Sequence, residues 1–160
     1  MSIARKLNRF LTEQQADYEI IAHDPTQSAI ATAKSCHVPL GQMAKAVLLD
    51  TEQDHLLVVL PANRRLELAE LRSDLGTRPH LTEEAKIAAI FDDCVLGALP
   101  PLGAGYGVET VVDDSLDAQS DVYFEAGDHT SLVHMSGAEF ARLTRQARRG
   151  HFSDAWTSMA

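Results

Sequence analysis

Two apolar runs joined by a short polar turn constrain the fold of this chain more than any other part of its sequence. Residues 44–50 read AKAVLLD and residues 55–60 read HLLVVL, with Glu52, Gln53 and Asp54 between them. Apolar runs of this length, joined by a few polar residues, are typical of paired β-strands. The sequence therefore predicts a buried hairpin over these residues.

Helical and strand-like segments alternate along the rest of the chain. Ile3, Leu7, Phe10 and Leu11 recur at helical spacing, which predicts an amphipathic helix over residues 2–15. Further helices are predicted over residues 29–36 after a cap at Ser28, over residues 66–75 before Gly76, after a cap at Thr82, and after a capping box of Ser136 and Glu139. Further strands are predicted over residues 18–22, 108–112, 122–126 and 132–135. This alternation predicts an α/β domain with a mixed, largely antiparallel sheet.

The size of the chain fits one domain. We place that domain at residues 1–150 of the 160, and a C-terminal tail without a clear pattern at residues 151–160. The hydrophobic share of 45% and the charged share of 23% are those of a globular protein. The sequence shows neither a membrane-spanning apolar run nor the apolar core of a secretory signal, and its two cysteines form no disulfide framework. These features predict a cytoplasmic protein.

The net charge of −9 argues against binding of nucleic acid by the whole surface. A polyanionic partner would have to meet a local basic patch, and the sequence offers two. The candidate patches are Arg142, Arg145, Arg148 and Arg149 near the C-terminus, and Arg64 with Arg65. The alternative is that these arginines are solvated side chains on helix faces.

A loop rich in glycine and proline lies at the end of the central third of the chain. Residues 97–107 read GALPPLGAGYG, which requires special backbone geometry. The loop either presents backbone N–H groups to a ligand or merely turns a corner. Its G-x-G-x-G run at residues 103–107 precedes a predicted strand rather than a helix, which argues against a dinucleotide-binding turn. No histidine or cysteine spacing predicts a metal site.

Lys45 stands out because it lies inside the first apolar run, between Ala44 and Ala46. A lysine on a buried strand must reach solvent along its stem or face a polar cavity, and small neighbours leave room for a ligand. The alternative is a lysine that protects the edge of a sheet. His129 follows a Gly-Asp turn and either reaches into a pocket or lies on the surface. Cys94, in an apolar context, is interpreted as core packing rather than as a nucleophile.

Taken together, these residues resemble the YbaK and prolyl-tRNA-synthetase-associated editing domains. The resemblance is carried by Lys45 on an early strand, by residues 97–101 read as G-x-x-x-P, and by the late turn AGDHT at residues 126–130. Residues 24–29, DPTQSA, also look like the polar stretch that these domains carry before their first short helix. The likeness extends from about residue 20 to residue 143.

The resemblance implies a mixed, mostly antiparallel, partly open barrel-like sheet with surrounding helices. It implies a hydrolase, a free-standing trans-editing deacylase that cleaves the ester bond of mischarged aminoacyl-tRNA carrying a small amino acid. Lys45 is then the catalytic residue and holds the tRNA 3′ end. The implied substrate-binding residues are Thr26, Ser28, Gly97, Ala98, Leu99, Pro100, Pro101, Gly103 and His129. The expected partners are the acceptor end of mischarged tRNA and an aminoacyl-tRNA synthetase, with no metal, cofactor, membrane or DNA.

The alternative is a non-catalytic module of the same fold, which would bind aminoacyl-tRNA or a nucleotide, or regulate a partner protein. Two features favour it. Ala46 follows the lysine, where many relatives carry a polar residue. The acidic net charge also weakens non-specific binding of tRNA.

Overall fold

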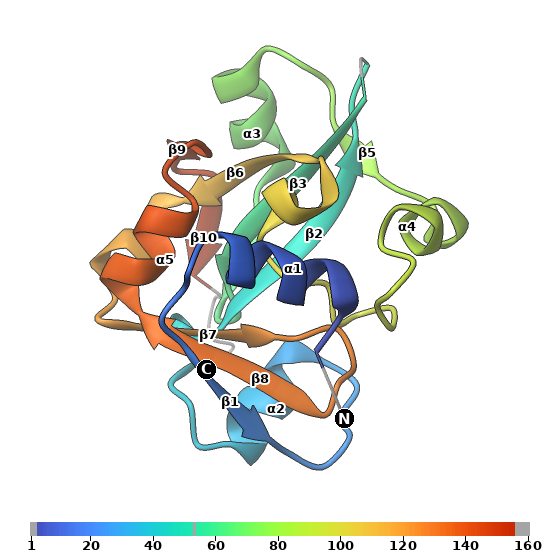
Figure 1. The fold of residues 1–160 in the computed structure, drawn as a ribbon. Helices are drawn as coiled ribbons and strands as arrows, with labels where there is room; N and C mark the ends of the chain where they lie inside the picture. The colour runs from blue at the N-terminus through green and yellow to red at the C-terminus, as the bar shows by residue number, and fades with distance from the viewer. Residues whose placement is uncertain (1–2, 53, 156–160) are drawn as a thin grey trace.

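Two sheets form the framework of the computed structural model, which describes residues 3–52 and 54–155. The strands are β1 (Glu19–Ala22), β2 (Ala44–Asp50), β3 (His55–Pro61), β4 (Arg64–Leu66), β5 (His80–Leu81), β6 (Glu109–Asp113), β7 (Asp121–Glu125), β8 (Ser131–Ser136), β9 (Arg148–Gly150) and β10 (Ser153–Ala155). The larger sheet has the order β5-β2-β3-β6-β9, and the smaller one β1-β8-β7. Figure 1 shows the smaller sheet lying across the lower end of the larger one.

The predicted hairpin is confirmed and lies in the middle of the larger sheet. β2 and β3 pair antiparallel from Ala44 opposite Pro61 to Asp50 opposite His55. β3 then pairs in parallel with β6, and β6 in parallel with β9, whereas both pairings of the smaller sheet are antiparallel. The predicted mixed, mostly antiparallel sheet is therefore confirmed.

Short helices surround these sheets (Figure 1). The α-helices are α1 (Arg5–Glu13), α2 (Ala29–Ser35), α3 (Leu68–Leu75), α4 (Glu84–Ile90) and α5 (Gly137–Leu143), and the 3₁₀ helices are η1 (Leu40–Gln42), η2 (Gly103–Tyr106) and η3 (Asp114–Ala118). Two predicted caps are confirmed: the Ser28 side chain accepts from Ala31 N–H, and the Ser136 side chain from Glu139 N–H. Gly76 ends α3 in the left-handed conformation, with φ at 71°. No described helix is long and apolar enough to cross a membrane.

Three apolar clusters fill the interior. The central cluster lies between the two sheets and α1, whose Leu7 and Leu11 are fully buried. A second cluster joins the larger sheet to α3 and to Phe152. The third surrounds α2 and includes Met43 and Tyr123. This third cluster anchors the side of the smaller sheet on which the polar residues described below gather.

Two expectations differ from the structure. Thr82 does not cap α4; its hydroxyl donates instead to Asp50 Oδ1 at 2.9 Å, and α4 begins after Glu83, whose side chain forms no cap. Leu66, expected in the helix before Gly76, instead ends β4, and α3 begins at Leu68. The strand β10, which pairs with β4, lies within residues 151–160, the segment that we place as a tail. The last five residues of that tail lie outside the described part of the chain.

Candidate functional site

The turn between β7 and β8 organises the candidate site. It comprises residues 126–130, and Gly127 takes φ 108°, which favours glycine. Asp128 Oδ1 accepts from Thr130 N–H and Ser131 N–H, both at 2.9 Å, and so holds the turn from inside. His129 follows with φ at 60° and is buried. The ring of His129 faces inward, where its two nitrogens lie within 3.3 Å of Glu125 Oε2 and Leu96 O.

The loop that begins at Gly97 is tied to this turn at two points. Val95 N–H donates to Gly127 O at 2.7 Å, and His129 Nε2 donates to Leu96 O at 3.0 Å. Gly97 itself is exposed and has φ 87°, and a Cβ built there would lie 3.2 Å from His129 Nε2. The structure therefore brings Gly97 and His129 together, although they are 32 positions apart in the sequence.

The first five residues of the loop, 97–101, offer two backbone donors. Ala98 N–H donates to Val95 O at 3.0 Å, and prolines 100 and 101 carry no N–H group. Within residues 3–52 and 54–155, the N–H groups of Gly97 and Leu99 have no hydrogen-bond acceptor. Two unsatisfied N–H groups beside an exposed glycine can stabilise negative charge on a ligand oxygen. The buried Ala98 cannot contribute its N–H in the same way.

A buried polar cluster lies behind the turn. Glu125 is 3% exposed, and its Oε2 accepts from the Thr32 hydroxyl at 2.7 Å. His129 Nδ1 lies 3.3 Å from the same oxygen, and His23 Nε2 lies 3.5 Å from Glu125 Oε1. The Thr26 hydroxyl contacts that of Thr32. One carboxylate thus lies between two imidazoles and a pair of hydroxyls. Burying so many polar groups costs free energy of folding.

Lys45 lies on the same side of the fold as this cluster. Met43 forms an isolated parallel bridge with Tyr123, so β2 and β7 leave that bridge in the same direction. Met43 and Tyr123 both pack in the cluster around α2. Lys45 and Glu125 each follow two residues later, and side chains two apart on a strand share a face. Burial lowers the pKa of the half-buried Lys45.

An open depression of about 470 Å³ lies beside His23. It is lined by Ile21, Ala22, His23, Asp24, Ser35 and Cys36. Burial and the negative charge of Glu125 both raise the pKa of the Cys36 thiol. Cys36 and His23 both line the depression. The charge of Glu125 acts on the Cys36 thiol, and His23 faces the same carboxylate, so the depression lies next to the buried polar cluster.

The other predicted site residues lie in different surroundings. Ser28 caps α2 and is exposed, and Pro100 and Pro101 are buried. Gly103 packs against β6, where a Cβ would lie 2.7 Å from Val108 O. The close approach of Gly103 to that strand supports a structural role for it. Thr26, Gly97 and His129 lie around one cluster, and Lys45 follows on the same side of the fold, so their assignment to a site stays a prediction.

Sequence reasoning missed Glu125, His23 and Thr32. Glu125 directly follows the run VYF at residues 122–124 of β7 and is buried there, and an acid next to such a run was an available signal. His23 and Thr32 carried no signal of their own, because the fold alone brings Thr32 on α2 and His23, directly after β1, to Glu125. Only the folded chain brings these three residues together.

Cys94 has the environment of a structural thiol. Burial raises its pKa to about 12, and the thiol donates to Asp93 Oδ1 at 3.2 Å. The Tyr106 hydroxyl donates to the same carboxylate oxygen at 2.8 Å. A thiol that stays protonated at neutral pH is a poor nucleophile, which agrees with the interpretation of Cys94 as core packing.

Most of the arginines in the two basic patches have acidic or carbonyl partners. Arg142 pairs with Glu139, Arg148 with Asp74, and Arg149 with Asp117. Arg64 binds Ser153 through its hydroxyl and its carbonyl, and Arg65 pairs with Glu67. These contacts favour a role of the arginines within the fold. The expected helix faces are correct only for Arg142 on α5, because the other four paired arginines lie on the strands β4 and β9.

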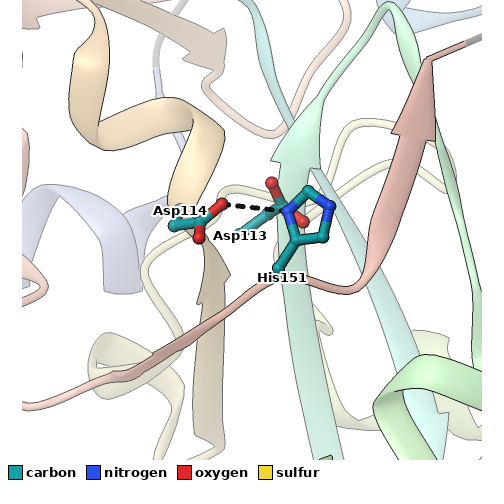
Figure 2. Close-up of side chains that lie close together, drawn as sticks. All are labelled: Asp113, Asp114 and His151. Carbon is teal, nitrogen blue, oxygen red and sulfur yellow. Dashed lines mark hydrogen bonds and ion pairs between the residues drawn. The ribbon is translucent and has the colours of Figure 1, made fainter.

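One group of described residues has the donor atoms and spacing of a metal site: Asp113, Asp114 and His151 (Figure 2). Its ligand atoms lie within 4.8 Å of one another. Asp113 is fully buried, and its carboxylate accepts from the hydroxyl and N–H of Ser115 and from Phe152 N–H. These contacts fix the C-terminal segment against β6, so the group has a structural explanation.

A second histidine, His134, gives the fold a dependence on pH. Burial lowers its pKa, but hydrogen bonds to Asp121 at 2.9 Å and Glu19 at 2.5 Å outweigh burial, and the net shift is upward. A raised folded-state pKa stabilises the fold below the unfolded value of about 6.5, and the gain disappears as pH rises through the folded value. We expect His134→Gln to cost about 1 kcal/mol in urea unfolding at pH 5.5 and less at pH 9. An equal cost at both pH values would contradict this origin.

The sequence matches one protein family, and the fold matches several solved structures. The sequence matches the family described as "Aminoacyl-tRNA editing domain" over residues 23–143. A protein of Escherichia coli K12, described as "Multifunctional Ser/Thr-tRNA deacylase ProXp-y", is 26% identical over 147 residues, which is 88% of this chain and 87% of that protein. The solved structure of a candidate trans-editing enzyme for prolyl tRNA synthetase has a TM-score of 0.81 at 18% identity, over 96% of this chain and 100% of that one. The solved structure of a hypothetical protein has a TM-score of 0.83 at 19% identity, over 94% of this chain and 100% of that one.

Proposed function

Because this chain belongs to the aminoacyl-tRNA editing domain family, we propose that it hydrolyses the ester bond of mischarged aminoacyl-tRNA and acts in trans. The proposed substrate carries a small amino acid, and serine and threonine come first because the Escherichia coli relative is described as a Ser/Thr-tRNA deacylase. The proposed partner of the protein is the acceptor end of the mischarged tRNA. A synthetase that releases the mischarged tRNA is the proposed source of substrate.

The observation that carries this proposal is the pair of unsatisfied N–H groups at Gly97 and Leu99 on the loop beside His129. Ester hydrolysis builds negative charge on the carbonyl oxygen as water attacks. Backbone N–H groups aimed in advance at that oxygen stabilise such charge by about 3 kcal/mol. An aminoacyl ester is already activated, so hydrolysis needs no covalent nucleophile. The inert environment of Cys94 is compatible with that route.

Lys45 supplies a positive charge on the same side of the fold. A cation there can bind a phosphate or the 3′-terminal ribose region of the tRNA and position the ester against the loop. Ala46, the feature that favoured a non-catalytic module, packs against the central apolar cluster. Its side chain therefore belongs to the core, and we retain the binding module only as an outcome of the test.

The test is a deacylation panel. Serine, threonine, alanine and cysteine are each attached to noncognate tRNAs, and release of the labelled amino acid is followed with and without the protein. Multiple turnovers on at least one mischarged tRNA, with correctly charged tRNA spared, are expected. Stoichiometric binding without turnover on the whole panel would replace the enzyme by the binding module.

Gly97→Ala is expected to lower kcat/KM by about tenfold to a hundredfold, because small displacements at a reacting centre have effects of this size. An alanine at φ 87° is strained, and its Cβ would lie 3.2 Å from His129 Nε2. Steady-state deacylation kinetics measure the effect. Gly76→Ala is the matched control, since Gly76 has φ 71° with nothing within 4 Å of its Cβ position. Equal activities of the two variants would show that the loop geometry does not matter to the reaction.

A further inference from the structure

α1 carries its positive charges where they stabilise the helix least. Arg5 and Lys6 lie in its first turn, Arg9 follows one turn later, and Glu13 at the opposite end is its single acid. The helix dipole disfavours cations near a helix N-terminus, and like charges four positions apart repel each other. The stability of α1 therefore gives no reason for arginine at positions 5 and 9.

The three cations of α1 differ in their partners. The ammonium group of Lys6 pairs with Asp92 at 3.1 Å. Arg5 and Arg9 are exposed, and neither guanidinium forms an ion pair or a hydrogen bond within the part of the chain that the structure describes. Four residues advance a helix by about 6 Å, so both side chains leave one face at close to the spacing of successive phosphates in a nucleic-acid strand.

The start of α1 lies on the turn that organises the candidate site. Ala4 N–H, directly before Arg5, donates to Ala126 O at 2.8 Å. A Cβ built at Gly127 would lie 2.8 Å from the Ala4 Cβ. Gly127 O also accepts from the N–H of Val95, at the base of the loop that offers the two backbone donors. The row of arginines on α1 therefore begins beside the candidate site.

A groove adjoins the other end of α1, and Figure 1 shows α1 at the front of the molecule with α5 to its left. The groove has a volume of about 160 Å³, and Phe10 and Gln14 line it from α1 while Arg145 and Gln146 line it from the segment after α5. Arg142 also lines it, but its charge is paired, and it donates to Gln14 O at 2.9 Å. Arg145 is exposed and forms no ion pair with any described residue. The groove thus adds a third available guanidinium beyond the end of the helix.

We propose that Arg5, Arg9 and Arg145 form an arginine track, which binds phosphates of the tRNA strand whose 3′ end carries the ester. The inference rests on the proposed deacylase function and names the surface of the protein that holds its substrate. When the ester lies at the loop, the preceding nucleotides of the single-stranded 3′ end extend away from the site. Their phosphates then follow α1 toward the groove.

The chemistry of the arginine track fits such a strand. A guanidinium donates two parallel hydrogen bonds to a phosphate, and it stays charged at any physiological pH. A local row of cations also explains how a protein with a net charge of −9 can hold a polyanion. The rest of the acidic surface then repels the body of the tRNA, so binding concentrates on the strand that leads to the ester.

The test replaces Arg5 and Arg9 together by glutamine, whose helix propensity is close to that of arginine. Binding of uncharged tRNA is measured by fluorescence anisotropy over a series of salt concentrations. The double variant is expected to bind roughly fivefold to thirtyfold more weakly at low salt. The slope of log K against log salt concentration is expected to fall by about 1.4, the counterion release of two single-strand phosphates.

Two further variants set the limits of the track. Arg72→Gln with Arg78→Gln is the matched control, because both arginines are exposed and form no ion pair among the described residues. Arg72 lies on α3, which packs on the opposite face of the larger sheet from α1. The control is expected to bind tRNA like the wild type. Arg145→Gln is expected to lower the salt slope by about 0.7, and an unchanged slope would overturn the part of the track beyond α1.

Kinetics show whether the track acts on phosphates. On a mischarged tRNA, the double variant of Arg5 and Arg9 is expected to raise KM with little change in kcat, because the lost contacts hold substrate and transition state equally. The corresponding aminoacyl ester of adenosine keeps the ester but has no phosphate, and the double variant is expected to cleave it as the wild type does. An equal loss on both substrates would overturn the track, because the substitutions would then disturb the site itself.

The outcomes keep the two proposals apart. Unchanged tRNA binding in the double variant, or an equal weakening in the control, would overturn the arginine track. A wild type that binds tRNA with the expected dependence on Arg5 and Arg9, but deacylates nothing, would overturn the proposed function and support the track.

Discussion

Replacing Lys45 with methionine is expected to lower kcat/KM for deacylation by about 10²–10³-fold while leaving the fold at least as stable. Burial lowers the pKa of Lys45, so its charged form is less favourable in the folded protein than in the unfolded chain. Wherever Lys45 is charged in both states, that charge reduces the free energy of unfolding, and an apolar isostere removes the penalty. Loss of activity together with unchanged or higher stability is the signature of a residue kept for function.

The measurement combines deacylation kinetics with urea unfolding of the same samples. Lys34→Met is the matched control, because Lys34 is an exposed lysine in the last turn of α2. Lys34→Met is expected to leave both kcat/KM and the free energy of unfolding nearly unchanged. Wild-type turnover in Lys45→Met would remove Lys45 from the site, and a large loss of stability would assign it to the fold instead.

Phe152→Ala is expected to reduce the free energy of unfolding by about 3–5 kcal/mol, the usual cost of deleting a fully buried aromatic side chain. Phe152 has no exposed surface and packs in the cluster between the larger sheet and α3. Its N–H donates to Asp113 Oδ2 at 3.1 Å, and that bond survives the substitution. The loss therefore measures packing alone, by guanidinium unfolding monitored with circular dichroism.

The neighbouring His151 provides the comparison. His151 is exposed and pairs with the exposed Asp114 at 3.3 Å, so His151→Ala is expected to cost less than about 1 kcal/mol. Similar small costs for both substitutions would mean that the C-terminal segment contributes little to the core.

The parts of the fold that the sequence predicted are those whose signals are local. The hairpin of β2 and β3, the caps at Ser28 and Ser136 and the stop at Gly76 each depend on a few consecutive residues. The family resemblance is confirmed by the match over residues 23–143. The short strands β4 and β10 were missed, because each has three residues and its partner lies almost ninety positions away. Strands of that length carry no periodicity to detect.

The residues of the candidate site likewise fall into those with a local signal in the sequence and those that only the fold reveals. Lys45, Gly97 and His129 were selected because a buried lysine, a glycine-rich loop and a polar turn are unusual within one chain. Glu125 was missed because its significance depends on two histidines that the fold brings to it from distant positions. Thr82 was misassigned because a threonine before two acids has the sequence of a cap, whereas Asp50 on β2 competes for its hydroxyl.

The pairing of β1 also bears on the order in which the chain can fold during synthesis. β1 pairs with β8, and Glu19 lies opposite His134, 115 positions later. The segment that carries His23 therefore has no sheet to join until the ribosome has released most of the chain. The β2–β3 hairpin can form early from neighbouring residues, but the polar cluster assembles only when β7 and β8 arrive. Until that late closure, a nascent chain holds Lys45 and His23 without the carboxylate of Glu125, so the candidate site and the fold are completed together.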